Sequence, residues 1–203
     1  MVRDYILNIM ENVWPMVLIV ITILSSIRIA YLHVRKKEFV LYKELLSLIF
    51  IVYILCLFYV VTFQDVDWSG SNFIPFKEIF RYEVGSRLFV KNAIGNILIF
   101  LPYGFFISYY LKTKKGYIII LLALIASLTI EYTQLLIGRV FDIDDILLNV
   151  IGSYVGHIIF YTLDVIEEHI PSVLKKPIIY NIIVLLLLVA IGAYFTLVIG
   201  LGV

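Results

Sequence analysis

The stretch TIEYTQLLIGRVFDIDDILLNVIG, residues 129–152, places ionisable and amide side chains between two long apolar segments. It contains one glutamate, three aspartates, an arginine, a glutamine and an asparagine. A charged group in hydrocarbon costs about 2.5–3.5 kcal/mol on insertion scales. This number of polar groups beside membrane-like sequence therefore requires an explanation. The stretch predicts two apolar helices joined by a polar turn, with the polar groups gathered at one end of both.

The whole chain has the composition of an integral membrane protein. Of its 203 residues 63% are hydrophobic and 15% are charged, against about 25% charged residues in a typical soluble domain, and its mean hydropathy is +1.04. The net charge of +1 gives no indication of a nucleic-acid partner. The single cysteine, Cys56, excludes an internal disulfide and a cysteine metal cluster. We expect no cofactor and no bound metal.

Apolar runs of roughly 20 residues predict about six transmembrane helices. They cover residues 13–32, 45–63, 93–111, 117–137, 146–163 and 178–200. The predicted fold is therefore all-α, a polytopic transmembrane helical bundle that forms a single membrane domain over residues 1–203.

The longest loop, residues 64–92, contains FIPFKEIFRY, in which aromatic and charged residues alternate at near-helical spacing. This pattern predicts a short interfacial helix that lies among the lipid headgroups. An ordinary loop outside the membrane is the alternative.

Lysine and arginine are distributed unevenly between the two sides of the predicted bundle. The loops after the first, third and fifth spans carry nine of them, and the opposite side carries six. Because loops rich in Lys and Arg stay in the cytoplasm, both termini are predicted to be extracytoplasmic.

Polar residues gather at the extracytoplasmic end of three consecutive spans. Glu131 and Gln134 share one helical face, Gly138 is suited to end that helix, and Arg139 follows it. Asp142 and Asp145 have the spacing of a helix N-cap and its third position. Because short links make these spans antiparallel neighbours, we expect one outward-facing pocket. Its predicted ligand-binding residues are Asn92, Asn96, Glu131, Gln134, Arg139, Asp142, Asp145 and Asn149.

Each of these residues also has a purely structural interpretation. Asp142 and Asp145 could simply cap a helix, Asn92 and Asn96 could join helices by hydrogen bonds, and Asp144 is expected to be solvated. Small residues for helix packing are predicted at Gly95, Gly152 and Gly156. Glu131 is the strongest functional candidate, because a carboxylate inside a span must either pair, here with Arg139, or be kept uncharged by its surroundings.

The pattern E-x-x-Q, R-x-x-D-x-x-D and N-x-x-G-x-x-x-G over residues 131–156 resembles the VanZ-like family of bacterial membrane proteins. NFIPFKEI, with Asn72, Pro75 and Phe76, looks like the family's extracytoplasmic motif, and NAIGNILIFLPYGF, residues 92–105, looks like its asparagine–proline span. The resemblance covers about 72–156. It implies a cell-envelope role in a Gram-positive bacterium and a link to resistance to teicoplanin-type antibiotics, but it supplies no biochemical activity.

Four functions remain open at this point. The first is a binding protein that lowers the access of lipoglycopeptides to their target. Its pocket would hold a membrane lipid, a lipid-linked cell-wall precursor or the drug, and Arg139 would bind a phosphate or carboxylate of that ligand. An enzyme acting on a lipid-linked substrate would use Glu131 as a general acid or base, with Asp142 and Asp145 orienting it or holding a divalent cation. A small transporter or flippase, and a scaffold without a ligand, are the remaining alternatives. The sequence indicates no oligomeric state.

Overall fold

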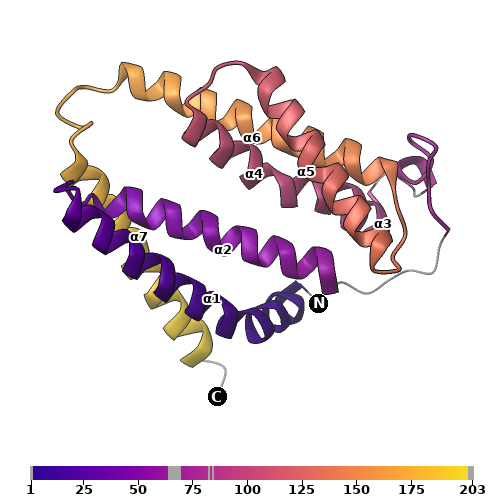
Figure 1. Ribbon diagram of the computed structural model, residues 1–203, viewed down its shortest axis with the longest axis horizontal. Helices are drawn as coiled ribbons and strands as arrows, with labels where there is room; N and C mark the ends of the chain where they lie inside the picture. The colour runs from indigo at the N-terminus through magenta and orange to yellow at the C-terminus, as the bar shows by residue number, and fades with distance from the viewer. Residues whose placement is uncertain (1, 64–69, 82, 84, 201–203) are drawn as a thin grey trace. The chain divides into compact units, whose positions relative to one another are not determined.

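The computed structural model describes the backbone of residues 2–63, 70–81, 83 and 85–200, and it is helical in almost every described segment (Figure 1). The side chains of residues 2–10, 63, 91, 191–192 and 194–200 lie outside the description. The helices are α1 (Val2–Val34), α2 (Leu41–Phe63), the 3-10 turn η1 (Ile79–Arg81), α3 (Arg87–Phe89), the π-helical turn η2 (Val90–Ile94), α4 (Gly95–Leu111), α5 (Gly116–Leu136), α6 (Ile143–His169) and α7 (Pro177–Gly200).

The all-α prediction is confirmed for the described residues, and five of the six predicted spans are found. Each is a helix long and apolar enough to cross a membrane: Glu11–Val34, Leu41–Thr62, Arg87–Leu111, Gly116–Leu136 and Ile143–His169. The sixth prediction, 178–200, falls on α7, whose described apolar part, Pro177–Ala190, is shorter than a span. Helices suit these sequences because a helix satisfies its own backbone hydrogen bonds where lipid offers no partners.

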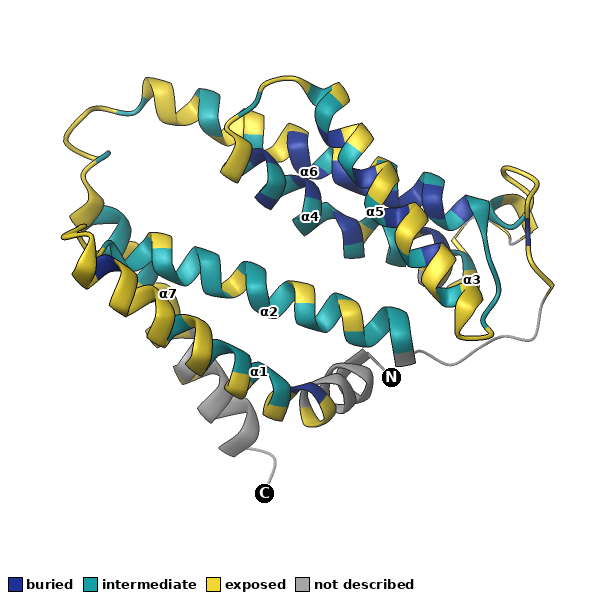
Figure 2. Cartoon of the chain, viewed as in Figure 1, coloured by how far each residue is buried: buried dark blue, intermediate teal, exposed yellow. Residues whose placement is uncertain are grey.

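The chain divides into two compact units, of which the first contains Met1–Val13 and Tyr53–Val165. In this unit α4, α5 and α6 run side by side, and most of the buried residues of the described chain lie on these three helices (Figure 2). On α5 the buried positions recur every four residues, from Ile119 to Glu131. The opposite face of α5 exposes large apolar side chains such as Leu121 and Ile125, as expected for a surface that meets lipid.

The second unit contains Trp14–Val52 and Ile166–Val203. Within it, Arg28 of α1 forms a two-pronged ion pair with Glu44 of α2, at 2.8 and 3.0 Å. The start of α2 is tied to α7, because Asn181 accepts the backbone N–H of Tyr42 at 3.0 Å.

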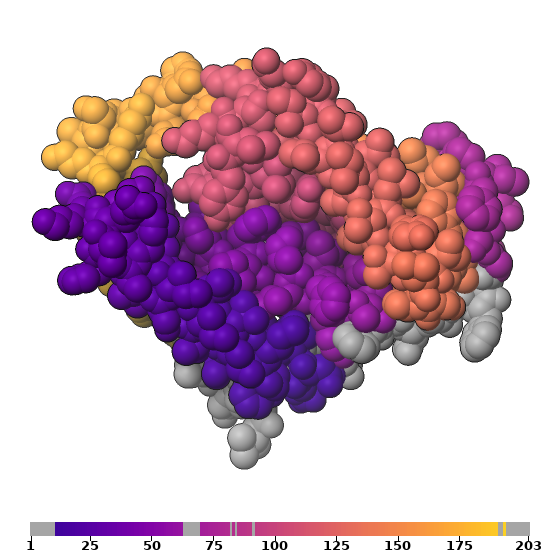
Figure 3. All heavy atoms as spheres, in the orientation of Figure 1, coloured from indigo at the N-terminus to yellow at the C-terminus, as the bar shows by residue number. Residues whose placement is uncertain are grey.

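The interfacial helix predicted in the 64–92 loop is shorter than expected. Residues 64–69 lie outside the described residues, and from residue 74 onward the chain makes turns that end in η1, a single 3-10 turn. A longer helix does not form because Phe76 has a φ of 68° and because the backbone N–H groups of this segment bond to a side chain of α6. The segment is thus a folded loop that lies against the α5–α6 end of its unit (Figure 3).

Candidate functional site

Glu131 is buried near the end of α5, with 2% of its surface exposed. One of its oxygens accepts the backbone N–H of Asp142 at 2.9 Å, which joins the end of α5 to the start of α6. Of the two alternatives for Glu131, the ion pair with Arg139 is not formed, since no ion pair joins these two described side chains. Arg139 instead donates to the carbonyl of Val61 in the last turn of α2, to which Gln134 also donates at 3.3 Å. Arg139 and Gln134 therefore cap α2, where unsatisfied carbonyls attract cations and donors.

Asn72 joins the loop at residues 72–81 to the turn before α6. Its backbone N–H donates to the carbonyl of Phe141 at 2.8 Å, and its own carbonyl accepts from Ile143 at 3.1 Å. Its side-chain amide donates to Asp142 at 2.9 Å and accepts from the backbone of Ile74 at 3.1 Å. Asn72 is 3% exposed, so this family-motif residue is an anchor of the loop.

Asp144 of α6 binds the same loop through its carboxylate. The expectation that Asp144 is solvated is therefore wrong. It is 1% exposed. Its two oxygens accept the backbone N–H groups of Phe76 at 2.5 Å, Glu78 at 2.7 Å and Ile79 at 3.2 Å. A buried carboxylate is stable here because three donors replace its water. The sequence offers no periodic signal for this role, since Asp144 lies off the face of α6 that carries Asp145 and Asn149.

Asp145 faces α4 and accepts a hydrogen bond from Asn96. The expected partner of Asn96, Asn92, does not join the pocket, because its side chain is exposed and Ala93 is buried instead. The reason is the π-helical turn Val90–Ile94, whose wider turn replaces the α-helical spacing on which that prediction rested.

Asn149 lies one turn further along α6 and is 5% exposed. Its side chain donates a hydrogen bond to Ser127 of α5 at 2.9 Å, so it joins α5 and α6. Further along α6, the ring Nδ1 of His157 lies 2.9 Å from the hydroxyl of Ser108 in α4, so this buried histidine has a hydrogen-bond partner. The serines were missed in the sequence because a small hydroxyl side chain is common on any apolar helix.

Two predicted packing glycines bring the backbones of α6 and α4 into contact. A Cβ at Gly152 would lie 2.2 Å from the carbonyl oxygen of Ile97, and one at Gly156 would lie 2.0 Å from that of Leu101. A side chain at either position would collide with the backbone of α4, as expected for glycines that permit a close helix approach.

The third predicted packing glycine is the wrong one. A Cβ at Gly95 would meet only the oxygen of Val90, at 4.0 Å. Gly104 has this role instead, since a Cβ there would lie 1.8 Å from the oxygen of Ser153. Gly104 faces the Gly152–Gly156 stripe because it lies further along α4, at the depth where the two helices approach most closely.

Aromatic side chains stand on the outside of the loop that Asn72 and Asp144 hold. Phe73 stacks on Phe141 with ring centroids 5.1 Å apart, and Phe76 lies 6.2 Å from Phe80. All of these loop rings are more than half exposed, and Pro75 between them is exposed as well. The polar backbone of the loop thus faces the carboxylates while an apolar surface faces outward.

Two carboxylate oxygens of the cluster stay open. In the part of the chain that the structure describes, the second oxygen of Glu131 and that of Asp145 accept no hydrogen bond. Every fully buried side-chain nitrogen or oxygen of the described residues has a partner, so each of these two oxygens keeps some exposed surface, although Glu131 as a whole is only 2% exposed. We refer to the side chains of Glu131, Asp142, Asp145 and Asn96 below as the outer acidic pocket, because the sequence predicts an outward-facing pocket at this position.

The carboxylates in this pocket are crowded. Burial raises the pKa of Asp142 above its ordinary value, and the negative charge of Asp144 raises it further, against the hydrogen bond from Asn72, which lowers it. A cation bound beside Asp142 would lower this pKa again, because an opposite charge favours the ionised carboxylate. No group of three or more His, Cys, Asp or Glu side chains among the described residues is arranged to hold a metal ion.

Comparison with known proteins gives one match. The family model VanZ/LLP1 matches residues 50–165, more than half of the chain, and that range includes the motif-bearing residues 72–156. No curated protein and no solved structure matches the chain.

Proposed function

This chain belongs to the VanZ/LLP1 family, and we propose that it lowers the susceptibility of a bacterial, Gram-positive envelope to teicoplanin-type lipoglycopeptides by binding an amphiphile in the outer acidic pocket. The amphiphile is a membrane lipid, a lipid-linked cell-wall precursor or the drug itself. Binding without turnover is sufficient for this role.

The observation that carries the proposal is the pair of open oxygens on Glu131 and Asp145, beside the half-buried Asp142. Carboxylates that accept no hydrogen bond at an accessible position favour a donor with positive charge. The matching ligand group is an ammonium, which the amphiphile would place against Asp145. Arg139, which the sequence offered as a partner for a phosphate, is engaged by the carbonyl of Val61.

The loop above the pocket supplies the second half of an amphiphile site. Phe73, Phe76 and Phe80 are 65%, 54% and 76% exposed, next to a pocket lined by carboxylates. Aromatic rings beside a charged recess match a ligand with a polar head and an apolar chain, because rings bury apolar surface while the recess binds the head.

Drug susceptibility tests the proposal. We expect the wild type, expressed in a susceptible Gram-positive host, to raise the inhibitory concentration of teicoplanin more than that of vancomycin. Asp145→Asn keeps an oxygen for Asn96 but removes the charge, so this variant should lose the protection. Asp164→Asn, at the far end of the same helix in an ion pair with Lys114 at 3.8 Å, is the matched control and should protect as the wild type does.

Membrane levels of the three proteins must be equal for this comparison. Full protection by Asp145→Asn would show that the pocket is not needed for resistance. A wild type without any effect on teicoplanin would remove the resistance role itself.

We also propose that the pocket faces outward, with both termini extracytoplasmic, on the basis of the Lys and Arg distribution. In a protein with Cys56 replaced by alanine, Phe80→Cys should react with an impermeant maleimide on intact cells, and Lys115→Cys only after lysis. Both positions are exposed. The reverse labelling pattern would turn the pocket toward the cytoplasm.

A further inference from the structure

The turn between α1 and α2 carries a lysine in a strained backbone position. Lys36 has a φ of 51°, its N–H donates to the carbonyl of His33 at 3.2 Å, and the N–H of Lys37 donates to that of Leu32 at 3.0 Å. This is the hydrogen-bond pattern of a Schellman helix end, whose left-handed residue is usually glycine. A lysine therefore occupies a position where glycine would cost less backbone strain.

The cations around this turn differ in what they contact. Arg28 pairs with Glu44, and Lys37 lies 5.4 Å from the centre of the Tyr31 ring and donates to its hydroxyl at 3.3 Å. Within the described chain, the Lys36 ammonium makes no hydrogen bond or ion pair. A positive charge is therefore held at this turn without an anion to neutralise it.

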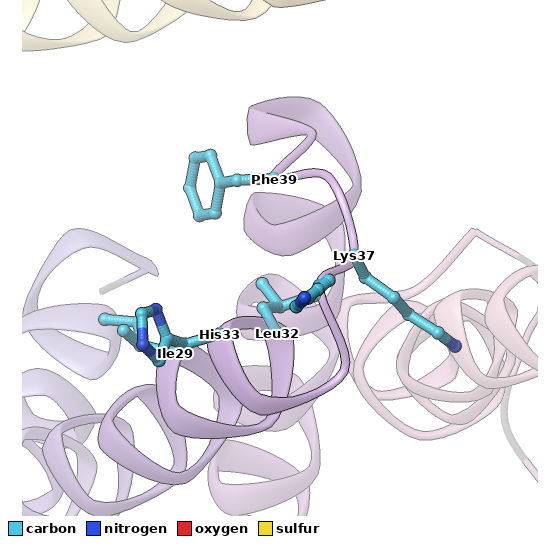
Figure 4. A pocket seen from close by; sticks show the side chains of 6 residues that line it. Ile29, Leu32, His33, Lys37 and Phe39 are labelled. Atoms are coloured by element: carbon cyan, nitrogen blue, oxygen red, sulfur yellow. The ribbon is translucent and has the colours of Figure 1, made fainter.

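Beside Lys36 the turn forms an open hollow with apolar walls. Figure 4 shows Phe39 on one side of it and Ile29 and His33 on the other, while Lys37 points away. Ile29 is 61% and Phe39 60% exposed, so both walls are available. The hollow is lined by Ile29, Leu32, His33, Lys36, Lys37 and Phe39.

We propose that this hollow binds the headgroup of an anionic phospholipid. The phosphate lies against Lys36 and His33, and the first part of an acyl chain follows Ile29 and Phe39. The anion is lipid-borne because the turn joins two helices long and apolar enough to cross a membrane, so lipid headgroups are the anions concentrated at its level. This site is separate from the outer acidic pocket and opposite to it in charge.

Lys36 has one competing role, which is to offset the negative end of the α1 dipole. The two roles separate in a glycine variant. Lys36→Gly suits the left-handed backbone and keeps the turn, yet it removes the cation. Lys112→Gly is the matched control, because Lys112 also ends a helix, α4, with a left-handed φ of 48° in another basic loop.

The test is native mass spectrometry of the purified full chain, titrated with phosphatidylglycerol and with phosphatidylcholine of the same acyl chains. We expect the wild type to bind phosphatidylglycerol more tightly at the first site. Lys36→Gly should weaken that affinity about fivefold, the effect of one lysine near a membrane surface, and leave phosphatidylcholine unchanged. Lys112→Gly should bind as the wild type does, and added inorganic phosphate should not displace the lipid.

Three results would overturn the inference. Equal affinity of the wild type for the two lipids removes the anionic headgroup as the ligand. An unchanged phosphatidylglycerol affinity in Lys36→Gly assigns Lys36 to the helix end alone. Displacement of phosphatidylglycerol by inorganic phosphate at comparable concentration assigns the hollow to a free anion.

Discussion

Gly104→Ala is expected to prevent the packing of α4 on α6 and to destabilise the protein by about 3 kcal/mol, the upper end of the usual cost of overpacking. The added Cβ would lie 1.8 Å from the oxygen and 2.5 Å from the carbonyl carbon of Ser153, both of which are backbone atoms of a buried helix. Backbone cannot rotate away as a side chain can, so the two helices must separate. Separation would also break the contact between Ser108 and His157, which joins the same two helices.

Thermal unfolding of the purified protein in detergent measures this effect, with Gly95→Ala as the control in the same helix. At Gly95 a Cβ has open space, and alanine is the better helix former by roughly 0.5–1 kcal/mol, so the control should be as stable as the wild type or more stable. A Gly104→Ala protein with unchanged stability would contradict the close approach of α4 and α6.

Asp144→Ala is expected to release the outer loop at residues 72–81 and to cost about 3–5 kcal/mol. The substitution leaves the N–H groups of Phe76, Glu78 and Ile79 without the acceptor that they share. Hydrogen bonds to a charged group are worth about 1.5–3 kcal/mol each, and the loss is limited because the freed loop can reach water.

Hydrogen exchange of the loop amides measures the release. In Asp144→Ala the amides of Phe76, Glu78 and Ile79 should exchange much faster than in the wild type. Asp145→Asn is the neighbouring control and should leave them protected, because Asp145 bonds to Asn96 and not to the loop. Slow exchange in Asp144→Ala would show that other contacts hold the loop.

The sequence was sufficient to predict helices but not which residues hold the loop. Hydropathy predicts the spans because each span must be apolar over its whole length. Likewise Gly138 ends α5 with a φ of 83°, and Asp142 caps the start of α6, as their positions predict. Both are local features, decided within a few residues. Asp144 and Asn72 depend on a contact between segments about 70 residues apart, for which the sequence holds no periodic signal.

Which residues of a helix face its neighbours was harder to predict than the presence of the helix. The prediction for Asn92 assumed an α-helical turn where the chain forms a π-helical one. Gly95 was predicted to let a neighbouring helix approach, whereas Gly104 is the residue of this span that lies against the backbone of α6. Glu131 and Asp145 stand out in the sequence because carboxylates beside apolar spans are rare enough to be informative by themselves.

The central claim is that the outer acidic pocket binds the ammonium group of an amphiphile, and an affinity comparison tests it most directly. The purified protein is titrated calorimetrically with lysophosphatidylethanolamine and with its N-acetylated derivative, which has the same chain and no ammonium. We expect the wild type to bind the amine about tenfold more tightly or more, the effect of one hydrogen bond to a charged group, and Asp145→Asn to bind both ligands equally. Equal binding of the two ligands by the wild type, or an undiminished preference for the amine in Asp145→Asn, would contradict the account.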